Sequence, residues 1–113
     1  MDKRTNKIIR NYISSVATIN SKLVKVYLFG SYAKQTDSPD SDIDLAFVIK
    51  DLKDEERFDL QVQLMLLASD FDMRIEPHPI SNLDFNSENP FVAEIKKTAI
   101  EIEPRTPDKS YTQ

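Results

Sequence analysis

The sequence contains no cysteine and a single glycine, Gly30. Without cysteine the chain can form neither a disulfide nor a thiolate metal site, which is typical of a protein in a reducing compartment. One glycine is too few for a dinucleotide-binding fingerprint, and too few for a P-loop. If the protein binds a nucleotide, it must hold the phosphates by another arrangement.

Long apolar runs and an excess of positive charge are also missing. The first residues, MDKRTNKIIRNYISS, lack the apolar block of a signal peptide, and no apolar run is long enough to span a membrane. We therefore expect a cytoplasmic protein without membrane contact. The formal net charge is −4, which argues against broad binding to a nucleic-acid backbone.

The length of 113 residues allows one compact domain. Apolar residues at three- and four-residue spacing predict helices, and β-branched or alternating stretches predict strands. The order helix–strand–strand–helix–strand–helix is typical of an α/β or α+β fold. We expect a helix over residues 4–19, strands over 22–29 and 42–49, a helix over 54–69, a strand from 71, a helix from 90, and a short strand at 100–102.

The pattern also predicts how these elements pack. The buried face of the helix over residues 54–69 is expected to carry Phe58, Val62, Met65, Leu66 and Ser69. We interpret the aromatic residues Phe58, Phe71 and Phe91 as core packing. Residues 104–113 are polar and rich in proline, so we expect a disordered tail.

The third strand is expected to end at Pro77 and Pro79, because proline cannot donate a backbone hydrogen bond within a sheet. An irregular connection over residues 80–89 would follow. His78 lies between the two prolines, and we interpret it as a loop residue without a catalytic role.

Four aspartates lie within eight residues, Asp37, Asp40, Asp42 and Asp44. We interpret the first two as solvated residues of a turn. Side chains alternate along a strand, so Asp42 and Asp44 point to one side, with Cα atoms roughly 6.5–7 Å apart. Two carboxylates at this separation can both reach one divalent cation, and Mg²⁺ prefers oxygen ligands. The pair therefore predicts a metal site.

Gly30 and Ser31 end the strand that precedes these aspartates. A strand that ends in Gly-Ser before a helical turn allows backbone N–H groups to approach a phosphate closely, and the serine hydroxyl adds a donor. Together with the aspartate pair, this turn predicts a nucleotide site.

The combination resembles the minimal nucleotidyltransferases of the DNA polymerase β-like superfamily. Their pattern is a strand, Gly-Ser, about ten residues and then Asp-x-Asp on the next strand; here Gly30-Ser31 is followed by ten residues and by the run SDIDLAFVI, which contains Asp42 and Asp44. Two positions differ, because relatives often carry glycine in place of Gln35 and arginine in place of Tyr32.

This resemblance implies the polymerase β-like fold, with a small mixed sheet of three to four strands, over residues 1–103. It implies a nucleotidyltransferase that binds two Mg²⁺ ions through Asp42, Asp44 and a third carboxylate, with ATP as the donor of AMP. Gly30 and Ser31 would hold the β- and γ-phosphates.

Two residues compete for the role of the third carboxylate, Glu76 and Asp72, and we favour Glu76 because it lies close to the end of the third strand. Arg74, between them, is a candidate for phosphate binding or for an ion pair with one of them. Lys34 is a candidate for phosphate binding or an ordinary solvated lysine.

The resemblance also implies a partner. Minimal nucleotidyltransferases often pair, as antitoxins, with a helical HEPN toxin, and some adenylylate a tyrosine of that toxin. We therefore expect a tyrosine hydroxyl as acceptor. The alternative is a non-catalytic protein that neutralises a helical partner by occlusion.

Overall fold

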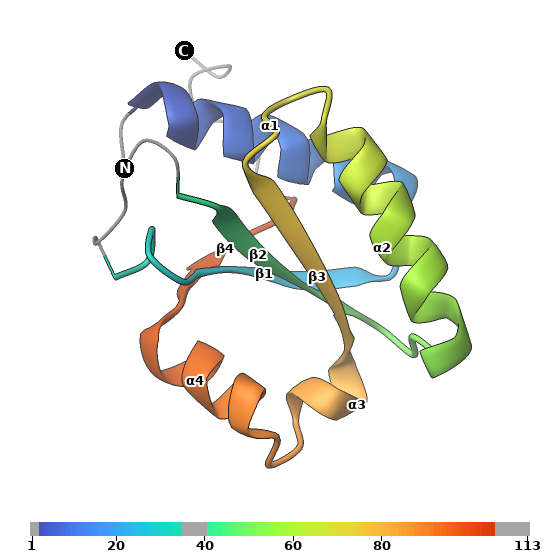
Figure 1. Cartoon of the computed structure of the whole chain (residues 1–113). Helices are drawn as coiled ribbons and strands as arrows, with labels where there is room; N and C mark the ends of the chain where they lie inside the picture. The colour runs from blue at the N-terminus through green and yellow to red at the C-terminus, as the bar shows by residue number, and fades with distance from the viewer. Residues whose placement is uncertain (1–2, 35–40, 106–113) are drawn as a thin grey trace.

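A four-stranded mixed sheet with helices on both sides forms the protein (Figure 1). The computed structural model describes residues 3–34 and 41–105. The sheet order is β3-β2-β1-β4; β1 runs antiparallel to β2 and β4, whereas β3 runs parallel to β2. The elements are α1 (Lys3–Ile19), β1 (Leu23–Phe29), β2 (Ile43–Ile49), α2 (Asp54–Ala68), β3 (Ile75–Ser81), α3 (Asn82–Phe85), α4 (Pro90–Thr98) and β4 (Ile100–Ile102). The predicted fold class and element order are confirmed, with the short helix α3 added.

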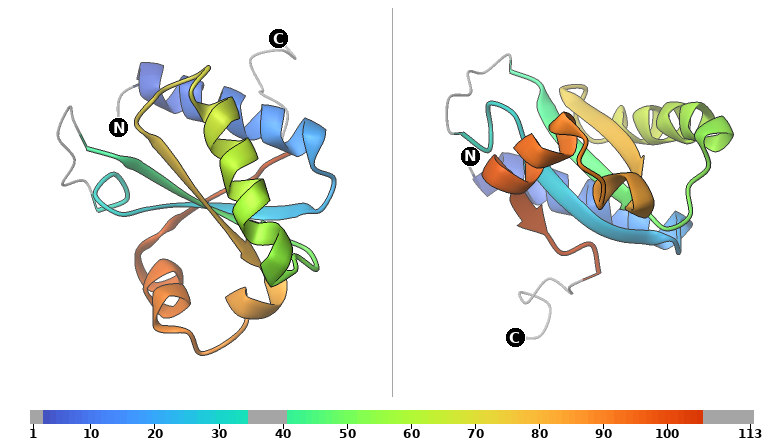
Figure 2. Two further views of the ribbon diagram at one scale, coloured as in Figure 1. Left: turned by 45° about the vertical axis from the view of Figure 1, so that its right-hand side comes forward. Right: turned by 90° about the horizontal axis from the view of Figure 1, so that it is seen from below.

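The central strand β2 separates two apolar clusters. One cluster contains Ile43, Leu45, Phe47 and Ile49 and lies beneath α1 and α2; we call this side the closed face. Ala46 and Val48 point the other way, toward α3 and α4, and we call that side the open face. In the left view of Figure 2, α1 and α4 lie on opposite sides of the sheet.

Helix α1 packs on the closed face as its periodicity predicts. Ile9, Ile13 and Val16 are buried. Tyr12 is buried with them, and its hydroxyl donates a hydrogen bond of 2.8 Å to the carbonyl of Leu64, which ties α1 to α2. Because the phenol is buried, its pKa is raised.

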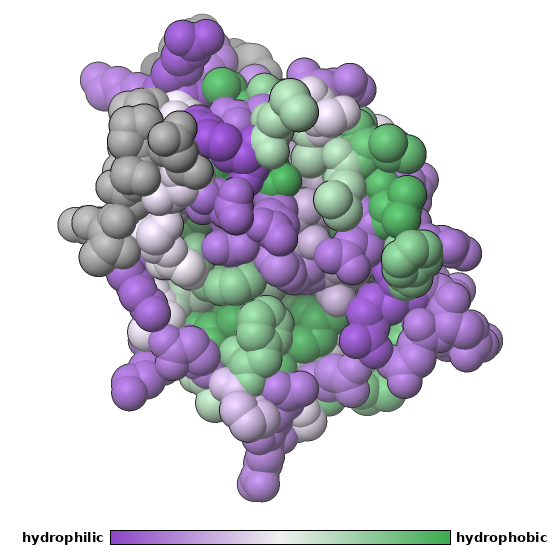
Figure 3. Space-filling view, in the orientation of Figure 1, coloured by the Kyte–Doolittle hydropathy of each residue, from purple (hydrophilic) through white to green (hydrophobic). Residues whose placement is uncertain are grey.

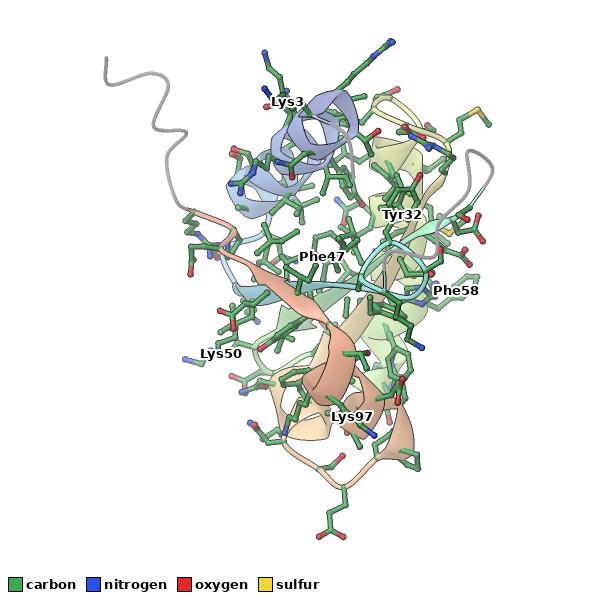
Figure 4. The ribbon with its side chains drawn as sticks, turned by 90° about the vertical axis from the view of Figure 1, so that its left-hand side faces the viewer. Lys3, Tyr32, Phe47, Lys50, Phe58 and Lys97 are labelled. Atoms are coloured by element: carbon green, nitrogen blue, oxygen red, sulfur yellow. The ribbon has the colours of Figure 1, made fainter. Side chains whose placement is uncertain are left out.

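Helix α2 buries a different side from the predicted one. Leu64 and Ala68 are its buried residues, whereas Phe58 is 73% exposed and Leu66 is 68% exposed. The helix has apolar residues on two sides, and Leu60, Leu64 and Leu67 also follow helical spacing. The predicted buried face of α2 and the predicted packing role of Phe58 are therefore wrong. In Figure 4, Phe47 lies inside the molecule and Phe58 at its margin.

Strand β3 continues through Pro77 and Pro79, so the prediction that it ends there is wrong. The amide of Ile43 donates to the carbonyl of Arg74 at 2.8 Å. The N–H and C=O groups of the even-numbered residues of β3 therefore point toward β2. The odd-numbered groups, including both proline nitrogens, point out of the sheet edge, where no ladder donor is required. The Gln61 side chain donates to the outward carbonyl of Pro77 at 3.3 Å.

The last helix begins as predicted. Asn89 is its N-cap and accepts a hydrogen bond of 2.8 Å from the amide of Phe91, and Pro90 occupies the first turn. Val92 and Ile95 are buried beneath it, whereas Phe91 is 41% exposed, so its predicted role as core packing is wrong.

The start of the predicted tail is packed against the sheet. Pro104 is buried, and the Arg105 guanidinium donates to the carbonyls of Asn20 and Leu23. Residues 106–113 lie outside the described residues. Within residues 3–34 and 41–105, no helix has the length and apolar character needed to cross a membrane.

Candidate active site

Three carboxylates meet at one end of the open face. Asp42 immediately precedes β2, Asp44 lies within it, and Glu76 lies directly opposite Asp44 on the parallel strand β3. Neighbouring strands are about 4.8 Å apart, and a period of two puts Asp42 and Asp44 on one side. Asp42 is exposed, and Asp44 and Glu76 are half-buried, so solvent and ligands can reach all three.

The only glycine packs against this group. Gly30 directly follows β1 and has a φ of 75°, a conformation that residues with a side chain rarely adopt. A Cβ at this position would lie 2.5 Å from Oδ2 of Asp44, well inside a van der Waals contact. Gly30 is therefore required both for the backbone turn and for the close approach of the Asp44 carboxylate.

The acids affect one another electrostatically. The pKa of Glu76 is raised, first because its carboxyl shares a hydrogen bond with Asp42, then because of burial and the negative charges of Asp42 and Asp44. The open face therefore gathers negative charge at one end, and the imidazole of His78 acts against that charge. A divalent cation would relieve this repulsion.

His78 is part of the same group, although we predicted it to be a loop residue. It lies in β3 two residues after Glu76, and its Nε2 is 3.2 Å from Oδ1 of Asp44. Phe29 and Phe91 flank its ring, with centroids 5.2 and 6.4 Å away. The two-residue spacing from Glu76 would have revealed His78, but the strand was predicted to end before it.

A hollow adjoins the acids on the side of His78. It has a volume of about 250 Å³, and the residues that line it are Arg57, Gln61, His78, Pro79, Ile80, Asp84, Asn89 and Phe91. In Figure 3, hydrophilic side chains lie above a recess with apolar side chains in the region between β3 and α4. The hollow therefore mixes aromatic surface with hydrogen-bonding groups, and His78, which lines it, contacts Asp44.

Asp72, the alternative third carboxylate, is bound elsewhere. It precedes β3, and its oxygens accept hydrogen bonds of 3.0 and 2.8 Å from Nε and Nη2 of Arg74. This pairing lowers the pKa of Asp72. Arg74 also donates to the hydroxyl of Tyr32 at 2.7 Å, so of its two predicted roles the structure shows the ion pair. The predicted start of this strand at Phe71 is wrong, because β3 begins at Ile75 and leaves Asp72 outside it.

The turn after Gly30 contains the other predicted phosphate-binding residues. The amide of Lys34 donates to the carbonyl of Gly30 at 3.2 Å, which places Ser31 within the turn next to the acids. The Lys34 ammonium lies 3.4 Å from a carboxylate oxygen of Glu94 on α4, and both side chains are about half exposed. Asp37 and Asp40, predicted to be solvated, and Gln35 lie outside the described residues.

The carboxylate oxygens of the three acids suit a hard cation, although in this structure they do not converge on one point. In the part of the chain that the structure describes, no three carboxylate or imidazole groups form a ready-made set of metal ligands. Asp44 contacts His78, and Glu76 contacts Asp42. Carboxylate oxygens are the ligands that Mg²⁺ prefers, and a bound cation would have to replace these two contacts.

The sequence matches the polymerase beta nucleotidyltransferase family over residues 11–106. It belongs to that family. The matched segment includes Gly30 and all three acids, so the candidate site is part of the nucleotidyltransferase domain. A comparison with curated proteins gave no match.

Solved structures with the nucleotidyltransferase fold are similar to this chain. A candidate nucleotidyltransferase from Sulfolobus solfataricus is 25% identical, with a TM-score of 0.61 over 84% of this chain and 76% of that one. A chain of a toxin–antitoxin complex with AMP-PNP is also 25% identical, with a TM-score of 0.58 over 89% of this chain and 76% of that one. A chain of a mutant MntA-HpeT toxin–antitoxin is 22% identical, with a TM-score of 0.56 over the same shares, and shows similarity of fold.

Proposed function

We propose that this nucleotidyltransferase transfers AMP from ATP to the hydroxyl of a tyrosine on a helical partner toxin, with release of pyrophosphate and of the hydroxyl proton, and thereby acts as an antitoxin. The observation that carries the proposal is the placement of Asp42, Asp44 and Glu76 on adjacent strands beside Gly30. This group combines the oxygen ligands of a Mg²⁺ site with a turn from which backbone groups can reach phosphate.

Each part of the site has a role in this reaction. Asp42, Asp44 and Glu76 would hold two Mg²⁺ ions, and Gly30 and Ser31 would bind the β- and γ-phosphates. Bound Mg²⁺ neutralises phosphate charge and lowers the pKa of an attacking hydroxyl. The protein contributes mainly by holding the α-phosphate and the acceptor in line, since positioning accounts for much of the rate of phosphoryl transfer.

The partner is proposed from the toxin–antitoxin structures that this chain is similar to, one of which contains AMP-PNP. We propose a HEPN-type toxin encoded beside this protein. A second candidate function is neutralisation by occlusion without catalysis. The exposed apolar residues of α2 favour a protein partner in either case, because they offer surface for binding rather than chemistry.

The test is to incubate the protein and the product of the adjacent gene with Mg²⁺ and ATP labelled at the α-phosphate. We expect label on a tyrosine of the partner. The double variant Asp42→Ala and Asp44→Ala should lose at least about 10³-fold of this transfer, since a site without its metal ligands loses the main source of charge stabilisation.

A matched control removes the same charge elsewhere. Glu88 and Glu103 are exposed, so Glu88→Gln together with Glu103→Gln should leave the transfer unchanged. If the Asp42→Ala and Asp44→Ala variant neutralises the toxin as well as the wild type, neutralisation is by occlusion and the enzymatic proposal is wrong.

A further inference from the structure

Helix α2 exposes an apolar stripe that the fold does not use. We define the outer stripe as Phe58, Val62, Met65 and Leu66, which are 73, 40, 49 and 68% exposed. Their spacing of three and four residues places them along one side of the helix. Figure 3 shows apolar side chains along the α2 side of the molecule. Single exposed apolar residues are common, but a continuous row of four large ones is typical of an interaction site.

Packing within the chain does not explain the outer stripe. The opposite side of α2 is buried through Leu64 and Ala68, and Leu60 and Leu67 pack against the same cluster. The helix therefore has a complete inner side, and polar residues at the outer positions would leave that packing intact. The turn that follows α2 adds Met73, which is 88% exposed.

The charges around the outer stripe indicate what kind of surface it fits. Glu55 and Asp59 are exposed beside its first turns, and Asp70 is exposed just beyond its last residue. Arg57, the one cation on this helix, is already paired with Asp54. The stripe is thus apolar with carboxylates near both ends.

This charge pattern argues against two other occupants. In a dimer of two copies packed stripe to stripe, carboxylates would face carboxylates in either the parallel or the antiparallel orientation. An anionic membrane surface would repel the same groups, whereas interfacial helices carry lysine and arginine beside their apolar side. A partner protein with basic residues beside an apolar surface would attract these carboxylates and would meet neither kind of repulsion.

We propose that the outer stripe of α2 docks an amphipathic helix of a partner protein, whose apolar side contacts Phe58 and Leu66 and whose lysine or arginine residues pair with Asp59 and Asp70. Phe58 and Leu66 are the main anchors because they are the most exposed. Side chains of this size dominate the binding energy of helix-in-groove and helix–helix contacts. The proposal depends on the proposed function only for the identity of the partner.

The test measures binding of the full chain to the product of the adjacent gene by isothermal titration calorimetry. The variant Phe58→Ser with Leu66→Ser should bind roughly 30-fold or more weakly, as expected for the loss of two anchors. The variant Asp59→Lys with Asp70→Lys should bind about tenfold more weakly at low salt, with a smaller loss at high salt. Circular dichroism will show that each variant is folded.

The control is Leu83→Ser in α3, which is 70% exposed but lies outside the outer stripe. It should bind within about twofold of the wild type. The stripe variant should still bind ATP with Mg²⁺. The variant Asp42→Ala with Asp44→Ala should still bind the partner. Failure of the docking proposal and failure of the proposed enzymatic activity are therefore distinguishable.

Three results would overturn the docking proposal. The first is a stripe variant that binds the partner as tightly as the wild type, and the second is a wild type that does not bind it. The third is a wild-type dimer in sedimentation experiments that Phe58→Ser with Leu66→Ser converts to a monomer, because the occupant would then be a second copy.

Discussion

The two faces of the sheet are packed in different ways. On the closed face, α1 and α2 cover the whole length of β2, and Leu45 and Phe47 are fully buried. On the open face, α3 and α4 cover Ala46 and Val48, but the end that carries Asp44 is left accessible. One alternating strand therefore supplies a core on one side and a site on the other. The comparison indicates that the closed face provides most of the stability and the open face tolerates unfavourable charge.

The largest effect on stability is expected on the closed face. Leu64→Ala should lower the free energy of unfolding by about 2–5 kcal/mol, because it leaves a cavity beneath α2. Leu66→Ala, two residues away and 68% exposed, is the matched control and should change it by less than about 0.5 kcal/mol. Urea unfolding will measure both. Equal losses would mean that α2 is rotated relative to the structure.

The next effect concerns the ion pair between Asp72 and Arg74 in the segment that precedes β3. Asp72→Asn should lower the free energy of unfolding by roughly 1.5–3 kcal/mol at pH 7, since Arg74 loses a charged, hydrogen-bonded partner. The folded state lowers the pKa of Asp72, so its stabilisation is present above the unfolded pKa and disappears as the pH falls through the folded pKa. Wild type and variant should therefore become equally stable in strong acid. A difference that persists there would contradict the ion-pair explanation.

Gly30→Ala should lower the free energy of unfolding by a smaller amount. This variant tests the contact between the turn after β1 and the acids. A left-handed φ costs a residue with a side chain roughly 1–2 kcal/mol, and the new Cβ would displace the Asp44 carboxylate. A double-mutant cycle separates the two causes. In the Asp44→Ala background the cost should fall to the backbone part alone. If the cost is the same in both backgrounds, Gly30 does not pack against Asp44.

The smallest expected effect is a gain in stability on the open face. Glu76→Gln in metal-free buffer should raise the free energy of unfolding at pH 7 by roughly 0.2–1 kcal/mol, because it removes like charges on adjacent strands. The raised pKa of Glu76 means that its neutral form stabilises the fold below the unfolded pKa and that this stabilisation is lost as the pH rises through the folded pKa. The gain should vanish below the unfolded pKa. Destabilisation at pH 7 would show that Glu76 is a structural acid.

The sequence predicts the open face better than the helix over the closed one. The placement of Asp42 and Asp44 on one side follows from a period of two. Glu76 is favoured because a strand end is expected at Pro77, but the structure makes Glu76 the second residue of β3 and places it opposite Asp44 through the parallel pairing with β2. The buried side of α2 could not be predicted from spacing alone. Phe58, Val62 and Leu66 repeat as regularly as Leu60, Leu64 and Leu67, and only tertiary packing against the core of the closed face selects the second set.

The third strand shows a different limit. Pro77 and Pro79 indicate a strand end when neighbouring strands are unknown, but they are compatible with an edge strand whose outward groups need no partner. That position depends on the parallel pairing of β3 with β2, which a sequence does not display. The same error hid His78, whose contact with Asp44 requires the strand to continue.

The most direct test of the candidate active site is Mn²⁺ binding in the presence of ATP, followed by electron paramagnetic resonance, because Mn²⁺ takes the same oxygen ligands as Mg²⁺. Asp42→Asn and Glu76→Gln should each weaken Mn²⁺ binding by at least about tenfold. Asp72→Asn should leave it unchanged. Wild-type affinity in Asp42→Asn, or an equal loss in Asp72→Asn, would contradict the assignment of the metal site to the open face.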